Sequence, residues 1–296
     1  MFIEESRVYM NVLEMKNIKK AYGSHVVLDN VDLILDKPGI VALVGPNGSG
    51  KTTLMNIAAN IIAPDAGTVR VFGKSNRDVT IFYDYSYLID NSVLYDYLTG
   101  YDHLKYVADT HKLGGVEIEK AENYLNITHF LNKKVSEYSM GMKQQLLFTM
   151  SILNDPKLLV LDEPFNGLDP STIIKVRKIL LDFAEEGKTI LLSSHNLSEV
   201  DQMTNHIVFV KEGDLIEEDI SVYRQGVYYF KVESPENTLE ILKDENAEFK
   251  HGELIVKAKE DNLSKLLQKI STHTQVYSVR REEVGSEERY KELFEI

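Results

Sequence analysis

The chain has 296 residues, of which 43% are hydrophobic and 27% are charged, and it carries a net charge of −13 at pH 7 with no cysteine. This composition is that of an ordinary globular protein and excludes a disordered or fibrous chain, a disulfide framework and a thiol nucleophile. The negative charge argues against bulk nucleic-acid binding and against adhesion to anionic lipid headgroups, because both need a basic surface.

The apolar segments of the sequence have the length of strands. The longest, such as Thr189–Leu192 and Ile207–Val210, are far shorter than the roughly 20 residues that a helix needs to cross a bilayer. The first seven residues contain early acids and lack the apolar stretch of a signal peptide. We therefore expect a cytoplasmic protein that does not cross a membrane by itself.

The N-terminal part, from about Val12 to Val71, alternates short strand patterns with turns. Ile40–Val44 is a continuous apolar run, which is typical of a strand buried on both faces of a sheet. A glycine-rich loop follows, and after it a helix is predicted from about Lys51 to Ile62. The segment Pro64–Gly67 contains the residues that end such a helix.

From about residue 90 to residue 155 the hydrophobic pattern becomes helical. Two further buried strands are predicted at Leu158–Leu161 and Thr189–Ser193, with a helix from about Thr172 to Glu186 between them. A strand, a helix and a strand in this order favour a mostly parallel α/β sheet.

The character of the sequence changes near residue 220. Beyond it we predict a small α+β appendage, so the expected division is 1–220 for the main domain and 221–296 for the appendage. Its expected strands and helices are Val227–Val232, Glu248–Lys250, Leu254–Ala258, Asn262–Ile270 and Glu287–Phe294.

The segment Gly45–Thr52 has the spacing G-x-x-x-x-G-K-[ST] and lies between a predicted strand and a predicted helix. Its glycines allow successive main-chain N–H groups to point inward and form an anion site at the helix N-terminus. Lys51 suits the β- and γ-phosphates of a nucleotide, and the Thr52 hydroxyl suits Mg²⁺. A chance match in a chain of this length has a probability of about 1%, so a nucleotide-phosphate site is favoured.

Two carboxylates, Asp162 and Glu163, directly follow the strand predicted at Leu158–Leu161. In open α/β sheets the ligand crevice lies at the carboxyl ends of the strands. Asp162 is expected to hold Mg²⁺ through its water shell. Glu163 is expected to point the other way across the pleat and to act as a base toward water attacking the γ-phosphate. The alternative is a pair of acids that only marks the end of a strand.

With their neighbours, these residues resemble the nucleotide-binding domain of ABC transporters, from about Leu13 to Glu218. The resemblance implies a P-loop NTPase core with a mostly parallel sheet, an antiparallel N-terminal part and an inserted helical subdomain at about 90–155. It also implies that ATP and Mg²⁺ are the cofactors. The residues it assigns to the nucleotide are Tyr22, Gly45, Pro46, Asn47, Gly48, Ser49, Gly50, Lys51, Thr52, Thr53, Asp90, Ser139, Gly141 and Asp169.

Three of these assignments depend on position within the family's motifs. Tyr22 stands where the family stacks an aromatic side chain on adenine. Tyr138–Met142 matches the signature motif LSGGQ at Ser139 and Gly141, while two methionines replace its first Gly and its Gln. In this family that motif contacts ATP held by the opposite subunit. Asp169 matches the D-loop and is expected at the subunit interface.

Two further residues complete the site that the resemblance implies. His195 follows the strand predicted at Thr189–Ser193 and matches the switch histidine, which we expect to bridge the γ-phosphate and the attacking water. Asp90 stands where the family has the Q-loop glutamine, and we expect its carboxylate to ligate Mg²⁺ or orient water. The expected catalytic residues are thus Glu163, His195 and Lys51, and the expected metal ligands are Thr52, Asp162 and Asp90.

Tyrosine is concentrated in one segment of the sequence. Seven of the 16 tyrosines lie between residues 83 and 106, namely Tyr83, Tyr85, Tyr87, Tyr95, Tyr97, Tyr101 and Tyr106. They are either core residues with ordinary exposed tyrosines or a docking surface, because tyrosine is enriched at protein interfaces. In ABC transporters this region receives a coupling helix of the membrane subunit.

The resemblance implies an ATPase subunit that powers an exporter whose permease is a separate chain, at the inner face of the cell membrane. It would work as a homodimer or with a paralogous ATPase, bind no nucleic acid and reach the membrane only through the permease. A soluble ABC-type ATPase of translation or DNA repair is the second hypothesis, although no tandem domain or sustained heptad is present. A P-loop kinase is the third, but it leaves the signature segment unexplained.

Overall fold

The computed structural model describes residues 11–222, 226–245, 247–258, 262–283 and 285–295. The chain divides into two compact units, Met1–Glu218 and Asp219–Ile296. The first unit contains an antiparallel sheet, a central sheet with parallel strands and a group of helices. The predicted fold class, with its parallel and antiparallel parts, is therefore confirmed.

The antiparallel sheet of the first unit has the strand order β2-β1-β4-β5. Its strands are β1 Leu13–Tyr22, β2 His25–Leu35, β4 Ala66–Val71 and β5 Lys74–Ser75. Alternate side chains such as Leu13 and Met15 are buried, which is the pattern of a sheet with one face on a core. β1 and β2 form a hairpin that pairs Tyr22 with His25, and Gly23 has the positive φ of 61° that this turn requires.

The central sheet has the order β10-β9-β3-β8-β7-β6, and β9, β3, β8, β7 and β6 pair in parallel. The predicted continuous apolar runs form its inner strands, which are buried throughout β7 and β8. The bounds are β3 Gly39–Val44, β6 Tyr85–Leu88, β7 Leu158–Leu161, β8 Thr189–Ser194, β9 His206–Lys211 and β10 Asp214–Asp219.

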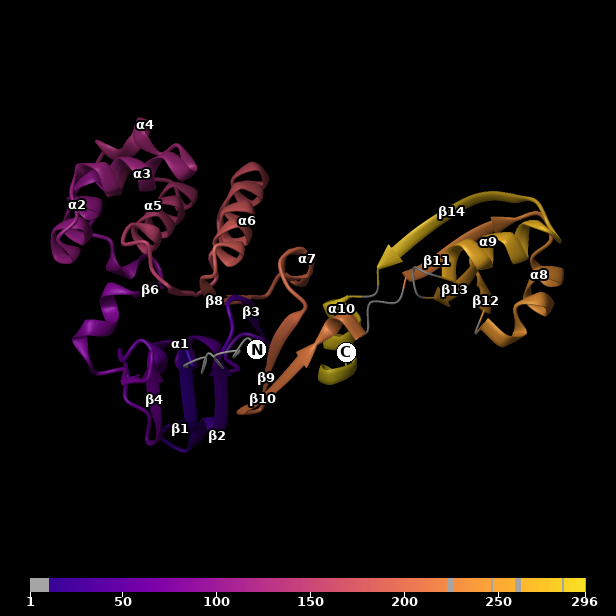
Figure 1. Ribbon diagram of the computed structural model, residues 1–296, viewed down its shortest axis with the longest axis horizontal. Helices are drawn as coiled ribbons and strands as arrows, with labels where there is room; N and C mark the ends of the chain where they lie inside the picture. Colours follow the sequence, from indigo (N-terminus) through magenta and orange to yellow (C-terminus); the bar gives the residue numbers. More distant parts are fainter. Residues whose placement is uncertain (1–10, 223–225, 246, 259–261, 284, 296) are drawn as a thin grey trace, which may run out of the picture. The chain divides into compact units, whose positions relative to one another are not determined.

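Helices α2 to α5 gather on one side of the first unit, away from β1 and β2 (Figure 1). The α-helices are α1 Lys51–Ala58, α2 Gly100–His111, α3 Gly115–Leu125, α4 Thr128–Leu131, α5 Met140–Ile152, α6 Pro170–Glu185 and α7 Leu197–Asp201. The 3-10 helices are η1 Val79–Tyr83, η2 Asn91–Val93 and η3 Val135–Glu137. In the described residues no helix is both long enough and apolar enough to cross a membrane.

The first helix after the phosphate loop is shorter than predicted. We expected it to reach Ile62, but α1 ends at Ala58 and Ala59 caps it. Asn60 then takes a left-handed conformation with φ of 57°, which a continuing helix does not allow. The chain leaves the helix before the proline that marked its end in the sequence.

The second unit contains a separate antiparallel sheet of order β12-β13-β11-β14. Tyr228 and Phe230 point to the same face as Leu254 and Val256, and this face packs against Ile270 and other residues of α9. The bounds are η4 Ile220–Val222, β11 Gly226–Val232, α8 Pro235–Ile241, η5 Lys243–Glu245, β12 Ala247–Lys250, β13 Glu253–Ala258, α9 Leu263–Ser271, β14 Val276–Glu283 and α10 Ser286–Phe294.

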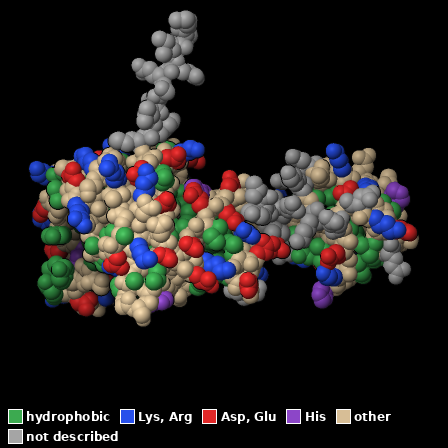
Figure 2. All heavy atoms as spheres, turned by 90° about the horizontal axis from the view of Figure 1, so that it is seen from below, with side chains coloured by type: hydrophobic (Ala, Val, Ile, Leu, Met, Phe, Trp, Pro, Cys, Tyr) green, Lys and Arg blue, Asp and Glu red, His purple; other side chains and the backbone are tan. Residues whose placement is uncertain are grey.

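One strand and one α-helix of the second unit were missing from the prediction, namely β14 and α8, as were the short 3-10 helices η4 and η5. On the face seen in Figure 2, acidic and basic side chains are interspersed over each unit, with no large basic field.

Candidate functional site

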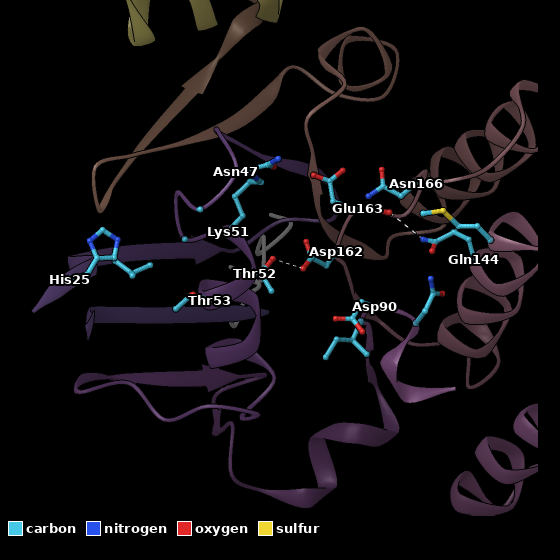
Figure 3. A pocket seen from close by; sticks show the side chains of 16 residues that line it. His25, Asn47, Lys51, Thr52, Thr53, Asp90, Gln144, Asp162, Glu163 and Asn166 are labelled. Atoms are coloured by element: carbon cyan, nitrogen blue, oxygen red, sulfur yellow. Dashed lines mark hydrogen bonds between the residues drawn. The ribbon is translucent and has the colours of Figure 1, made fainter. Parts of the chain in front are cut away.

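A cleft of about 640 Å³ opens in the first unit, beside the loop that joins β3 to α1 (Figure 3). It contains most of the phosphate-loop residues and both carboxylates that follow β7. The residues that line it are His25, Val27, Asn47, Gly48, Gly50, Lys51, Thr52, Thr53, Ile89, Asp90, Asn91, Met140, Gln144, Asp162, Glu163 and Asn166.

The loop between β3 and α1 needs glycine at several positions. Gly48 and Gly50 have φ of 81° and 111°, a left-handed conformation that glycine adopts at no steric cost. A Cβ on Gly45 would lie 2.6 Å from the main-chain oxygen of Val210. The backbone is thus able to curve tightly in front of the N-terminus of α1, where N–H groups attract anions.

Lys51 is only 6% exposed, although it carries a charge. Its Nζ donates hydrogen bonds to the main-chain oxygens of Gly45 (2.6 Å) and Pro46 (3.1 Å), so the ammonium is held within the curve of the loop. Burial lowers the pKa of Lys51, while the carboxylates of Glu163 and Asp162 oppose this shift. An incompletely solvated cation in this place favours an anionic ligand.

Thr52 and Asp162 come together although they are 110 residues apart in sequence. The Thr52 hydroxyl donates to Asp162 Oδ2 at 2.6 Å, and the buried Ser193 hydroxyl donates to Asp162 Oδ1 at 2.5 Å. Hydroxyl and carboxylate oxygens are the donors that Mg²⁺ prefers, so this pair fits the predicted metal site. In the described part of the chain no cluster of three or more His, Cys, Asp or Glu side chains could hold a metal ion.

Glu163 reaches the cleft for a different reason from the predicted one. We expected it to continue the pleat of the strand, but β7 ends at Leu161 and Glu163 has a φ of 48°. The chain turns sharply at this residue, and its side chain meets His195. His195 Nδ1 donates to Glu163 Oε2 at 2.8 Å, which brings together two of the predicted catalytic residues.

Asp90 lines the cleft, but it is also a capping residue. Its Oδ1 accepts a hydrogen bond from the main chain of Ser92 at 2.7 Å, and bonds to Ser92 lower the pKa of Asp90. The adjacent Asn91 was missed in the sequence. Its Oδ1 is buried and has no hydrogen-bond partner among the described residues. The signal that could have identified Asn91 is its amide side chain, which directly follows Asp90 where the family has a glutamine.

Seven predicted nucleotide residues lie outside the lining of the cleft, and so does the predicted catalytic His195; the seven are Tyr22, Gly45, Pro46, Ser49, Ser139, Gly141 and Asp169. Tyr22 is 52% exposed at the end of β1, and its hairpin partner His25 lines the cleft instead. Ser139 is the N-cap of α5, and Asp169 is the N-cap of α6. Their predicted contacts with a nucleotide on an opposite subunit remain predictions.

Gly141 marks a close approach between two predicted motifs. A Cβ at this position would lie 2.8 Å from the main-chain oxygen of Gly167, and one on Gly167 would lie 2.7 Å from Met140 Cγ. The start of α5 therefore packs directly on the segment that precedes Asp169. Met140, Gln144 and Asn166 belong to these same segments and line the cleft, although they were not predicted as site residues.

The seven clustered tyrosines fall into two groups. Tyr85 is buried, and the hydroxyl of the half-buried Tyr87 donates to Asn56 Oδ1 at 3.0 Å. The others are exposed, with Tyr97 reaching 69% and its ring centroid lying 5.7 Å from that of Tyr95. Two of the tyrosines therefore pack inside and five face outward, and the docking surface remains a prediction.

In sequence, the chain is similar to ATP-binding proteins of ABC transporters. A family model described as "ABC transporter" matches residues 28–166. The lantibiotic transport ATP-binding protein SrtF of Streptococcus pyogenes is 38% identical over 69% of this chain and 89% of its own. The bacitracin transport ATP-binding protein BcrA of Enterococcus faecalis is 39% identical over 70% of this chain and 68% of its own.

A solved structure of an ATP-binding cassette is also similar to this chain. A dimeric ATP-binding cassette in a post-hydrolysis state, bound to ADP and Pi, superposes with a TM-score of 0.63 at 25% identity and covers 70% of this chain and 98% of that one.

Proposed function

Since the chain belongs to the ABC transporter family of ATP-binding proteins, we propose that it hydrolyses ATP to drive a separate membrane permease. The observation that carries this proposal is the convergence of three groups on one cleft. These are the phosphate loop with Lys51, the pair Thr52 and Asp162, and Glu163, whose carboxylate accepts a hydrogen bond from His195 beside the cleft. Together they provide a phosphate site, a place for a cation and a base.

Lys51 and the N–H groups of the loop bind the β- and γ-phosphates of ATP in this proposal. Thr52 and Asp162 would hold Mg²⁺, which neutralises phosphate charge when bound. Asp90 and Asn91 face the cleft and offer further oxygen atoms to the cation or to water.

Glu163 is the general base of the proposed reaction. Its carboxylate accepts a proton from the water that attacks the γ-phosphorus atom, while the bond from that atom to the oxygen of ADP breaks. His195 donates to Glu163 Oε2 and so orients the carboxylate, leaving Oε1 for the water. The histidine is mostly exposed, so it is also accessible to the γ-phosphate.

Two ATPase subunits are proposed to work together, either as two copies of this chain or as this chain with a paralogue. Ser139 and Gly141 lie outside their own cleft, which suits contact with ATP on the opposite subunit. Asp169 would then lie at the interface. The dimeric cassette bound to ADP and Pi supports this arrangement. Binding of ATP would close the dimer and hydrolysis would reopen it.

The names of SrtF and BcrA link those proteins to the transport of a lantibiotic and of bacitracin. We propose an exporter of peptide, antibiotic or other hydrophobic cargo for this chain. The exposed tyrosines between residues 83 and 106 form its docking surface for the permease, since large aromatic side chains anchor protein interfaces. The permease would hold the subunit at the inner face of the cell membrane.

Substitution of the base tests the proposed function. Purified Glu163→Gln is expected to bind ATP like the wild type and to hydrolyse it at least about 10²-fold more slowly, because the amide does not accept the proton. Steady-state phosphate release and binding of a fluorescent ATP analogue measure the two quantities. Normal hydrolysis by this variant would overturn the assignment of the base, and a wild-type protein without ATPase activity would overturn the function.

A further inference from the structure

The main chain of Glu163 adopts a conformation that is unfavourable for its residue type. Its φ of 48° lies in the left-handed region, which few non-glycine residues enter because Cβ approaches the main-chain oxygen. Such a conformation persists only where the surroundings hold it. Glu163 directly follows Asp162, and its carboxylate is the proposed base. The contacts that hold its main chain therefore matter for the reaction.

Two buried side chains hold the peptide groups on either side of Glu163. The main-chain N–H of Glu163 donates to Ser193 Oγ at 2.8 Å, and Ser193 is fully buried in β8. On the other side, Gln144 Nε2 donates to the main-chain oxygens of Glu163 (3.2 Å) and Pro164 (3.1 Å). Figure 3 shows this amide reaching across the cleft wall toward Glu163.

Gln144 is well suited to this task by its burial and its donor number. It is 5% exposed, and its amide has two hydrogens, one for each of the two oxygens. Without Gln144, both oxygens lose this partner, and because the bond to the Pro164 oxygen is buried, its loss penalises the turn. The turn at Glu163 is therefore coupled to the presence of this side chain.

The two supports come from different parts of the first unit. Ser193 lies in β8 of the central sheet and also donates to Asp162 Oδ1, so it moves with the cation site. Gln144 lies in α5, the helix that Ser139 caps and that packs against Gly167. The position of the Glu163 carboxylate thus depends on how α5 is placed relative to the sheet.

We propose that Gln144 is a positioning residue that transmits the placement of α5 to the Glu163 carboxylate. The inference rests on the proposed function, in which Glu163 is the base. When α5 shifts, the amide of Gln144 displaces the main-chain oxygens that it binds, and the carboxylate turns relative to the attacking water. Hydrolysis is therefore fast only when α5 is placed so that Gln144 keeps the Glu163 carboxylate directed at the attacking water.

Substitution of Gln144 by methionine tests this inference. Methionine has a similar length and helix propensity but no donor. Gln144→Met is expected to lower kcat about tenfold and to leave the KM for ATP within about twofold, because the base is displaced while the phosphate site is intact. The matched control is Gln145→Met, since Gln145 is half-buried on the same helix and does not line the cleft. This control is expected to hydrolyse ATP like the wild type.

A double-mutant cycle separates positioning from a general structural role. If Gln144 acts through Glu163, then Gln144→Met adds nothing to the loss in Glu163→Gln, and the double variant hydrolyses ATP at the rate of Glu163→Gln alone. Losses that multiply would overturn the inference, and so would a raised KM with an unchanged kcat, which indicates a direct contact with the nucleotide. If Gln144→Met does not fold, Gln144→Leu, which also lacks the donor, is measured in the same cycle with the same expectation.

The outcome is distinguishable from failure of the proposed function. An inactive wild-type protein overturns the function itself. A wild-type protein that hydrolyses ATP, together with an equally active Gln144→Met, overturns only the role of Gln144.

Discussion

The cleft and the capped ends of α5 and α6 contain similar polar residues but use them differently. In the cleft, Thr52 and Ser193 donate to Asp162, and His195 donates to Glu163, so side chains from distant segments bind one another. At the helix ends, Ser139 and Asp169 accept hydrogen bonds from their own helices. The cleft is therefore assembled within one chain, whereas the helix ends only present a surface.

The largest expected loss of ATP hydrolysis comes from substitution of Lys51 in the cleft. In Lys51→Ala the oxygens of Gly45 and Pro46 lose their donor and the phosphates lose their cation. We expect kcat/KM for ATP to fall by about 10²-fold or more, since a buried charge aimed at an anion has this effect. Phosphate release at several ATP concentrations measures it. Lys105→Ala, at an exposed ion pair on α2, is the control with wild-type kinetics, and equal kinetics for both variants would contradict the phosphate role.

A smaller effect is expected where the chain meets a partner. The double substitution of Tyr95→Ala and Tyr97→Ala removes two exposed rings that contact each other, and we expect the association with the permease to weaken about tenfold. Binding of ATP is expected to be unchanged, because neither ring lines the cleft. Co-purification from detergent-solubilised membranes measures the association, with Tyr277→Ala as the exposed control. Unchanged recovery of the permease would show that these tyrosines do not form a docking surface.

The same contrast explains which features were predictable. The strand Leu158–Leu161 was predicted with its observed bounds, because a strand buried on both faces is apolar throughout. The strand β14 was missed, since its second half is the charged run Arg280–Glu283 and shows no apolar alternation. A local sequence pattern shows which residues are buried. It does not show that a charged segment forms an edge strand by pairing with its neighbour.

The site shows the same limit. The phosphate loop was predicted from its spacing and Asp162 from its position after a buried strand, and both signals are local in the sequence. The left-handed turn at Glu163, and its support by Gln144 and Ser193, arise from contacts across 19 and 30 residues. No local pattern marks such a pair in advance, and the pleat assumed for Glu163 was wrong for this reason.

The smallest expected effect concerns the cap of α6. Asp169 accepts hydrogen bonds from Ser171 and Thr172, and these bonds hold the pKa of Asp169 well below its usual range. Asp169→Ala removes the cap, so we expect the melting temperature of the isolated protein to fall by about 2–4 °C at neutral pH. Asp169 does not line the cleft, so binding of ATP by the isolated chain is expected to persist.

The pH dependence of this effect follows from the sign of the pKa shift. Because the pKa of Asp169 is lower in the folded than in the unfolded chain, the charged cap stabilises the fold fully above the ordinary carboxyl pKa of about 3.9. Its contribution is lost as the pH falls below that value toward the lower pKa of the folded state. The difference in melting temperature between the wild type and Asp169→Ala should therefore shrink in acid, whereas Ser139→Ala, which removes an uncharged cap, should show a difference that does not depend on pH. A constant difference for Asp169→Ala down to strongly acidic pH would show that its charge does not matter, and the capped ends of α5 and α6 would then be equivalent.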